Sequence, residues 1–102
     1  MEFLIVKTTL ENKKDAESLS NKIIESGLGA CVQISEIRST YKWKGKIETV
    51  KEYRIEIKTS SNNYKKLQEF ILKHHKYELP EIIAIKITAG YGKYLNWIKE
   101  IK

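Results

Sequence analysis

The chain has 102 residues, of which 41% are hydrophobic and 31% charged, and its formal net charge is +6. This length and composition are typical of one globular domain, residues 1–102, and exclude an intrinsically disordered chain. The single cysteine, Cys31, excludes an internal disulfide, and no apolar run approaches the roughly 20 residues of a membrane-spanning helix. We therefore expect a cytoplasmic protein with no secretory signal and no membrane partner.

The first expected element is a buried strand at about residues 3–8, which begins with four apolar residues and is rich in β-branched side chains. A helix follows it. Asn12 can cap this helix through Asp15, and Gly27 supplies the left-handed residue that ends it. Apolar residues recur at helical spacing between these two ends: Ala16, Leu19, Ile23 and Ile24.

Residues 30–59 are predicted to form one long antiparallel hairpin with its turn at Gly45. Apolar and polar residues alternate on both sides of that turn. Each strand would have about twelve residues, more than the usual five or six.

The rest of the chain predicts a helix, a strand and a short helix. A Ser/Asn cluster at 60–63 is expected to cap the second helix, whose inner face would hold Leu67, Phe70, Ile71 and His74. Pro80 stands just before the fourth strand. The C-terminal helix is expected to pack through Trp97 and an apolar stripe: Tyr91, Tyr94, Leu95, Ile98 and Ile101.

The element order β-α-β-β-α-β predicts an α+β, ferredoxin-like fold with an extended hairpin and a C-terminal helix. Two helices cannot cover the outer half of so long a hairpin, which carries Tyr41, Trp43 and Tyr53. Long, uncovered aromatic strands pair with other chains. We therefore expect copies of the chain to associate through the hairpin.

Five segments resemble one family when taken in order: ACVQI (30–34), YKWKGKI (41–47), E..I.IKT (52–59), HHKYELPEI (74–82) and YLNWI (94–98). Together they resemble the CutA family, the divalent-cation tolerance proteins, over essentially the whole chain. The resemblance implies a homotrimer similar to the PII signalling proteins and no enzymatic activity. It also implies binding of Cu(II) or another divalent cation, which need not be bound in the purified protein.

The resemblance further implies that His74 and His75 bind the metal, because bacterial members use a histidine pair with a cysteine of the first strand. Lys7 stands at the place of that cysteine. Imidazole suits copper, but adjacent helical side chains diverge by about 100°, so the pair can share an ion only where the helix ends. The alternative is that His74 packs and His75 is solvated. Cys31 is either a small packed residue or a soft metal ligand.

A second set of residues is expected to line a subunit interface or a small-ligand cleft between subunits: Tyr41, Trp43, Tyr53, Tyr77 and Glu81. Glu78 and Glu81 flank Pro80, but no nucleophile or orienting base accompanies them, so the sequence predicts no enzyme. A PII-like signalling or scaffold protein remains the alternative function.

Two other functions of this fold are disfavoured. An RNA-recognition domain needs aromatic and glycine residues that the strand VKEYRIEIKT (50–59) does not have. All the basic residues except Arg38 and Arg54 are lysines, which recognise bases and phosphates less well, so no nucleic-acid partner is predicted. An acyl-phosphate hydrolase needs an anion-binding loop, but LENKKD (10–15) has neither glycine nor arginine.

Overall fold

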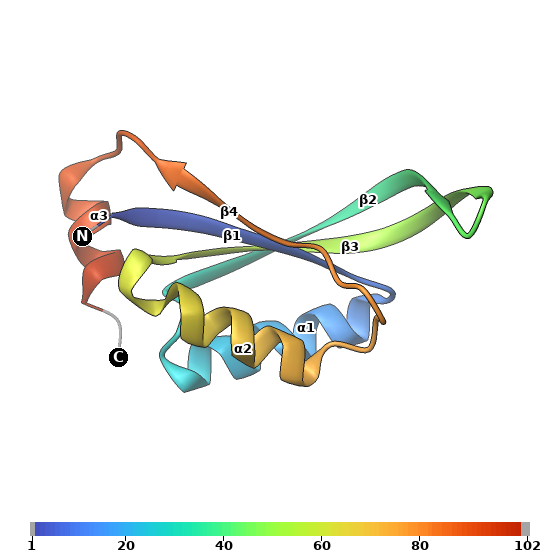
Figure 1. Ribbon diagram of the computed structural model, residues 1–102. Helices are drawn as coiled ribbons and strands as arrows, with labels where there is room; N and C mark the ends of the chain where they lie inside the picture. Colours follow the sequence, from blue (N-terminus) through green and yellow to red (C-terminus); the bar gives the residue numbers. More distant parts are fainter. Residues whose placement is uncertain (1, 101–102) are drawn as a thin grey trace.

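The computed structural model describes residues 2–100 and confirms the predicted α+β fold. The elements are β1 (Phe3–Leu10), α1 (Lys13–Ser26), β2 (Cys31–Trp43), β3 (Lys46–Ser60), a 3-10 turn η1 (Ser61–Asn63), α2 (Tyr64–His74), β4 (Ile82–Ile87) and α3 (Gly92–Lys99). The strands form one antiparallel sheet in the order β2-β3-β1-β4. Helices α1 and α2 cover one face of this sheet, and α3 lies at the end where β1 begins (Figure 1).

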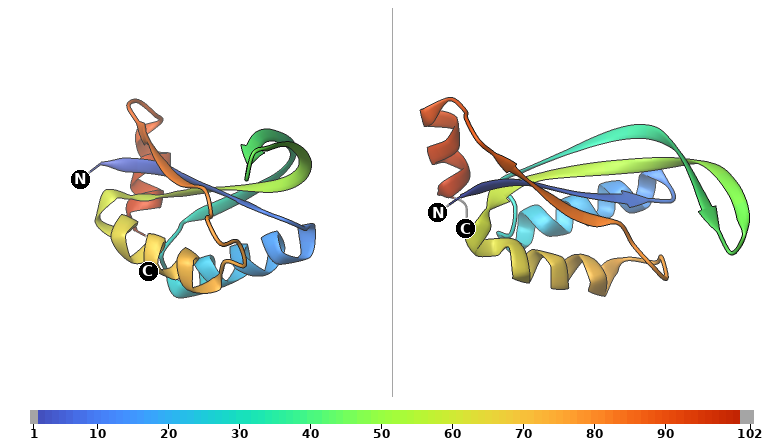
Figure 2. Two further views of the ribbon diagram at one scale, coloured as in Figure 1. Left: turned by 45° about the vertical axis from the view of Figure 1, so that its right-hand side comes forward. Right: turned by 45° about the horizontal axis from the view of Figure 1, so that its top comes forward.

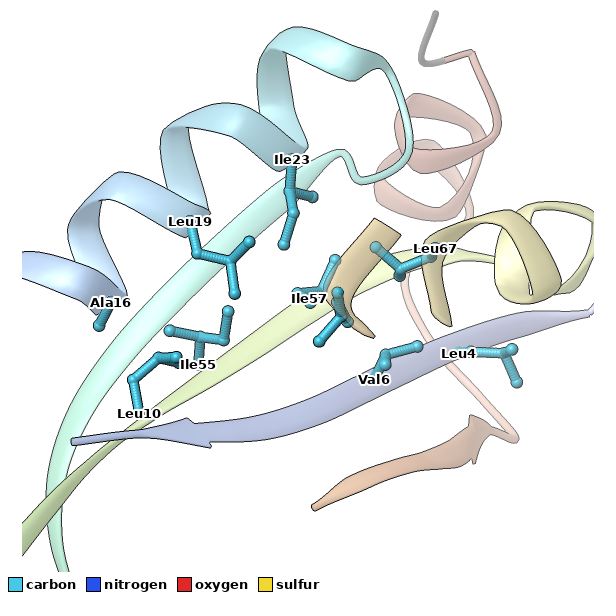
Figure 3. Packing of buried hydrophobic residues seen from close by; sticks show 10 residues of the cluster. Leu4, Val6, Leu10, Ala16, Leu19, Ile23, Ile55, Ile57 and Leu67 are labelled. Carbon is cyan, nitrogen blue, oxygen red and sulfur yellow. The ribbon is translucent and has the colours of Figure 1, made fainter. Parts of the chain in front are cut away.

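The alternation along β1 and β3 separates the two faces of the sheet. On the inner face, Val6 lies opposite Ile57, and both are fully buried beneath the helices (Figure 3). Most of the core comes from these strands and from the inward stripes of α1 and α2: Leu4, Val6, Leu10, Ala16, Leu19, Ile23, Ile55, Ile57, Leu67 and Ile71. The residues between them on β1 and β3 face outward, away from α1 and α2.

The ends of α1 are as predicted, whereas the start of α2 is not. The Asn12 side chain accepts a hydrogen bond of 2.8 Å from the Asp15 backbone N–H, and Gly27 ends the helix at φ 76°. At α2 the expected side-chain cap is wrong, because neither Ser60 nor Asn63 caps the helix. The Asn63 amide donates to Thr59 Oγ1 at 3.4 Å, and the 3-10 turn leads the chain into α2.

The β2–β3 hairpin is as long as predicted, with strands of 13 and 15 residues. Lys44 and Gly45 form the two-residue turn at φ 51° and 81°, the geometry of a tight hairpin turn. The outer half of the hairpin extends beyond α1 and α2 (Figures 1 and 2). Tyr41 and Trp43 are exposed there. Tyr53 lies on the opposite face, where its hydroxyl donates to Glu36 at 3.2 Å, so the three aromatics do not form one surface within a copy.

The C-terminal helix packs through fewer residues than the stripe predicted. Ile98 is fully buried, but Tyr91 and Trp97 are exposed, and the Trp97 ring stacks on Tyr94 at 5.7 Å. Ile101 lies outside the described residues. The prediction that Tyr91 and Trp97 pack against the rest of the chain is wrong within this copy, because their side chains are 71% and 50% exposed. Within residues 2–100, no helix is long and apolar enough to cross a membrane.

Candidate metal and ligand site

Helix α2 ends at His74, and the two histidines could share a metal ion only at such a helix end. His75 already has extended backbone angles of φ −85° and ψ 141°. The next residues, 75–81, cross from the helical layer to the start of β4. The two imidazoles therefore leave the backbone at a helix end, yet they enter different surroundings.

His75 has no free ring nitrogen. Its Nε2 lies 2.8 Å from the Thr9 carbonyl oxygen and donates to it, while its Nδ1 accepts the backbone N–H of Tyr77 at 3.1 Å. These two bonds fix a neutral tautomer, since a proton on Nδ1 would point at another donor. Burial lowers the pKa of His75 below its ordinary value, although the hydrogen bond to Thr9 and the charges of Glu52 and Asp15 oppose this shift. His75 is therefore suited to holding the segment in place.

His74 has one nitrogen available for a metal. Its Nδ1 donates to the Phe70 carbonyl oxygen at 2.9 Å, which leaves the lone pair of Nε2 unused by that bond. Metal-binding histidines commonly hold their second nitrogen in this way, because the bond fixes the tautomer and the ring. The Phe70 ring, 4.4 Å away, adds further orientation.

His74 lines a cavity of about 260 Å³ between α1 and the end of α2. Asp15 lines the same cavity and brings a carboxylate to it. Lys76 Nζ lies 3.2 Å from the Asp15 carboxylate, and the Asn12 side-chain amide donates to the same group. Sequence analysis missed Asp15 as a site residue, because its local position already explained it as the partner of a helix cap.

Cys31 and Lys7 lie apart from the histidines. His75 bonds to Thr9 of β1, and the residue of β2 level with Thr9 across the sheet is Ser35. Cys31 is four residues from Ser35 along β2, about 13 Å at roughly 3.3 Å per residue. Lys7 Nζ pairs with Glu56 at 3.2 Å on the outer face. Within residues 2–100 no three His, Cys, Asp or Glu side chains converge to hold a metal ion. One copy therefore does not supply the complete ligand set that the resemblance implies.

A second cluster forms around Tyr77, on the same segment. Its hydroxyl donates at 2.7 Å to Glu52 of β3, a carboxylate that is only 6% exposed. Burial, followed by the hydrogen bond and the charge of Glu52, raises the pKa of Tyr77 above its ordinary value. The phenol therefore stays protonated and serves as a donor. Glu52 was missed as a partner because 25 residues separate it from Tyr77.

The other residues predicted to line a cleft lie at separate places on the chain. Tyr41 is close enough to contribute to the raised pKa of Tyr77. Trp43 lies at the turn end of β2, where Lys44 Nζ is 5.9 Å from its ring. Glu81 is exposed just before β4. The structure therefore brings Tyr77 and His75 together, with 4.9 Å between their ring centroids, places Tyr41 on the same face of the sheet as Glu52, and leaves Tyr53 on the other face.

The sequence profile of the CutA1 divalent ion tolerance protein family matches residues 4–101. The chain belongs to this family. The CutA1 fold is also seen in the solved structure of the periplasmic divalent cation tolerance protein CutA from Archaeoglobus fulgidus, with a TM-score of 0.94, 33% identity and 96% of each chain covered.

Two curated CutA relatives differ in length. The divalent-cation tolerance protein CutA of Thermotoga maritima is 37% identical over 95% of this chain and 96% of its own length. The chloroplastic protein CutA of Arabidopsis thaliana is 38% identical over 94% of this chain but 53% of its own length. The chain thus spans about half the length of the plant and mammalian relatives it matches. Because relatives are named chloroplastic or periplasmic, the cytoplasmic location stays a prediction.

Proposed function

We propose that this CutA1 family member is a non-catalytic homotrimer that binds divalent cations, Cu(II) foremost, as part of metal-ion tolerance. The observation that carries this proposal is the outer face of the sheet, which neither α1 nor α2 covers. An apolar row crosses it on β1 and β4, and we name it the outer apolar row: Phe3, Ile5, Ile83, Ile85 and Ile87. Ile83 and Ile85 are 46% and 45% exposed.

An exposed row of this kind marks a surface that another protein covers. We favour a second copy of this chain as the protein that covers the row. The outer half of the long hairpin is also uncovered, and association of copies would shield both surfaces. The exposed row supports association of copies, but the proposal of three copies comes from the family resemblance.

Cation binding is supported by the lone pair of His74 Nε2 and the carboxylate of Asp15 in one cavity. Imidazole and carboxylate together suit Cu(II) and Zn(II). Lys76 is 74% exposed, and an exposed ion pair is weak enough for a cation to displace its ammonium from Asp15. Solvent or a neighbouring copy would supply the remaining ligands.

Calorimetric titration of Cu(II) into the purified protein tests the cation site. We expect His74→Ala and Asp15→Asn each to weaken binding at least tenfold, because each removes one of two protein ligands. Lys76→Met should strengthen binding, since it removes the competitor for Asp15. His75→Gln is the matched control and should leave the affinity within a few-fold of the unsubstituted protein. Unchanged affinity in His74→Ala would remove this histidine from the function.

A PII-like protein that binds a small ligand between subunits is the second candidate. The cluster of Tyr77, Glu52 and Tyr41 favours it, because it combines aromatic surface with a buried carboxylate on the hairpin side of the sheet. Fluorescence of Trp43 in a Trp97→Phe background would test it with ATP as the probe. A saturable change that Tyr41→Ala abolishes would support this candidate, and no change would count against it.

A further inference from the structure

The outer face of the sheet carries a row of charges beside the outer apolar row. Lys7 of β1 and Glu52, Arg54 and Glu56 of β3 all point away from α1 and α2, because their neighbours Val6, Ile55 and Ile57 point into the core. Lys7 lies directly opposite Glu56 in the sheet. The row therefore alternates in sign along β3 on a face that neither α1 nor α2 covers.

Three of these four charges have partners within the copy. Lys7 Nζ binds Glu56 Oε2 at 3.2 Å, and the side chains of this pair are only 22% and 29% exposed. Glu52 accepts the Tyr77 hydroxyl at 2.7 Å. Arg54 differs, because its Nε–H is shielded from solvent and finds no acceptor among residues 2–100.

Within the part of the chain that the structure describes, Arg54 lacks a hydrogen-bond acceptor for its shielded Nε–H. The guanidinium is always charged, and a shielded N–H without an acceptor destabilises the state that contains it. On the two adjacent strands Arg54 lies beside Thr9 and Ser35, whose hydroxyls carry no charge to balance the guanidinium. The nearest carboxylates, Glu52 and Glu56 on its own strand, already accept the Tyr77 hydroxyl and the Lys7 ammonium. A carboxylate on a neighbouring copy would supply the missing acceptor.

We infer that Arg54 of one copy forms an ion pair with Glu56 of the neighbouring copy. Lys7 engages Oε2 of Glu56, which leaves Oε1 to accept a second donor. The row of charges is complementary to itself, so a rotated copy can offer a carboxylate to each arginine. This inference rests on the proposed self-association and adds the contact that determines how the copies align.

The ion pair between Arg54 and Glu56 would mainly slow the dissociation of the copies. A shielded ion pair whose one partner is removed leaves the other charge uncompensated, and at interfaces this loss speeds dissociation. Removing both partners leaves no unpaired arginine, so the double variant keeps only the loss that follows from separating Lys7 from Glu56. A misaligned copy would also leave Arg54 without an acceptor, so the pair would select the correct alignment.

Subunit exchange between isotopically labelled and unlabelled protein, followed by native mass spectrometry, tests the pair. We expect Arg54→Met and Glu56→Gln each to speed exchange at least tenfold. The double variant should exchange more slowly than Glu56→Gln, because both lack the within-copy partner of Lys7 but only Glu56→Gln keeps an unpaired Arg54. Arg38→Met is the matched control, because it removes the only other arginine from the opposite face, and its exchange should equal that of the unsubstituted protein. Circular dichroism would verify that every variant is folded.

Each result decides the inference. Exchange as slow in Arg54→Met as in the unsubstituted protein would overturn it, and so would additive effects in the double variant. Either result would leave the proposed assembly standing. An unsubstituted protein that forms no assembly would instead overturn the proposed function, and the ion pair with it.

Discussion

Two buried threonines on the inner face of the sheet differ in one respect. Thr8 and Thr59 are both fully buried. The Thr59 hydroxyl donates to the Leu28 carbonyl oxygen at 2.8 Å, whereas the Thr8 hydroxyl has no partner among the described residues. A buried hydroxyl without a hydrogen bond destabilises the folded state.

Thr8→Val should therefore stabilise the protein, by about 1 kcal/mol, because it replaces the unpaired hydroxyl with a methyl group of similar size. Thr59→Val should destabilise it by about 1 kcal/mol, because it breaks a made hydrogen bond and leaves the Leu28 carbonyl unpaired. The free energy of unfolding in urea measures both. A loss of stability in Thr8→Val would show that its hydroxyl is satisfied in solution.

His75 predicts how stability depends on pH. Burial lowers its pKa in the folded protein, while the unfolded chain takes up a proton near the ordinary value of 6.5. Below that pH the unfolded state binds more protons, so the stability contributed by His75 is complete above about 6.5 and is lost as the pH falls.

The His75→Gln variant should lose less stability than the unsubstituted protein between pH 7 and pH 5, since glutamine does not titrate there. His74→Gln keeps His75 and should retain the steeper dependence. Urea unfolding at several pH values, in the presence of a chelator, makes the comparison. Equal slopes for His75→Gln and the unsubstituted protein would mean that His75 is not held neutral.

At the scale of elements, the segment 75–81 is held to the sheet at two places. His75 bonds to Thr9 of β1, and Tyr77 bonds to Glu52 of β3. These contacts carry the chain from the helical layer to the start of β4, whereas the ring of the metal candidate His74 is held separately by Phe70 of α2.

Tyr77→Phe should destabilise the protein by about 2 kcal/mol, because it leaves the buried carboxylate of Glu52 without its donor. The double variant Tyr77→Phe/Glu52→Gln should recover part of this loss, since no buried charge then remains. Urea unfolding at neutral pH is the measurement. Additive losses in the double variant would mean that the two side chains act separately.

The elements themselves could be predicted from local signals. Asn12 marks the start of α1 through its side-chain oxygen, Gly27 and Gly45 mark a helix end and a turn through their positive φ, and the structure has those boundaries. The cap of α2 was mispredicted because the 3-10 turn and the contact between Asn63 and Thr59 replace it. Such a turn has no distinctive sequence.

The candidate site could be predicted only in part. The histidine pair was recognisable because its residues are adjacent, whereas Asp15 and Lys76 meet across 61 residues and Glu52 and Tyr77 across 25. The separation of Cys31 from the histidines depends on the strand register, which no single motif encodes. The available lone pair of His74 likewise depends on a bond to Phe70 that only the folded helix makes.

At the scale of the whole molecule, one copy is long and covered on one side only. Its extents are 45 × 26 × 21 Å, with the hairpin reaching beyond the helices (Figure 1). The outer apolar row, the Arg54 side chain and the aromatic end of the hairpin all lie on the side that α1 and α2 leave uncovered, and α3 meets the row at the end formed by Phe3 and Ile87. Association of copies would cover all three features together.

Light scattering of the purified full chain at micromolar concentration tests this association most directly. The account predicts a particle of three times the 11.9 kDa of one chain, unchanged on tenfold dilution. A particle of 11.9 kDa over the same range would contradict it, because the outer face of the sheet would then remain exposed to water.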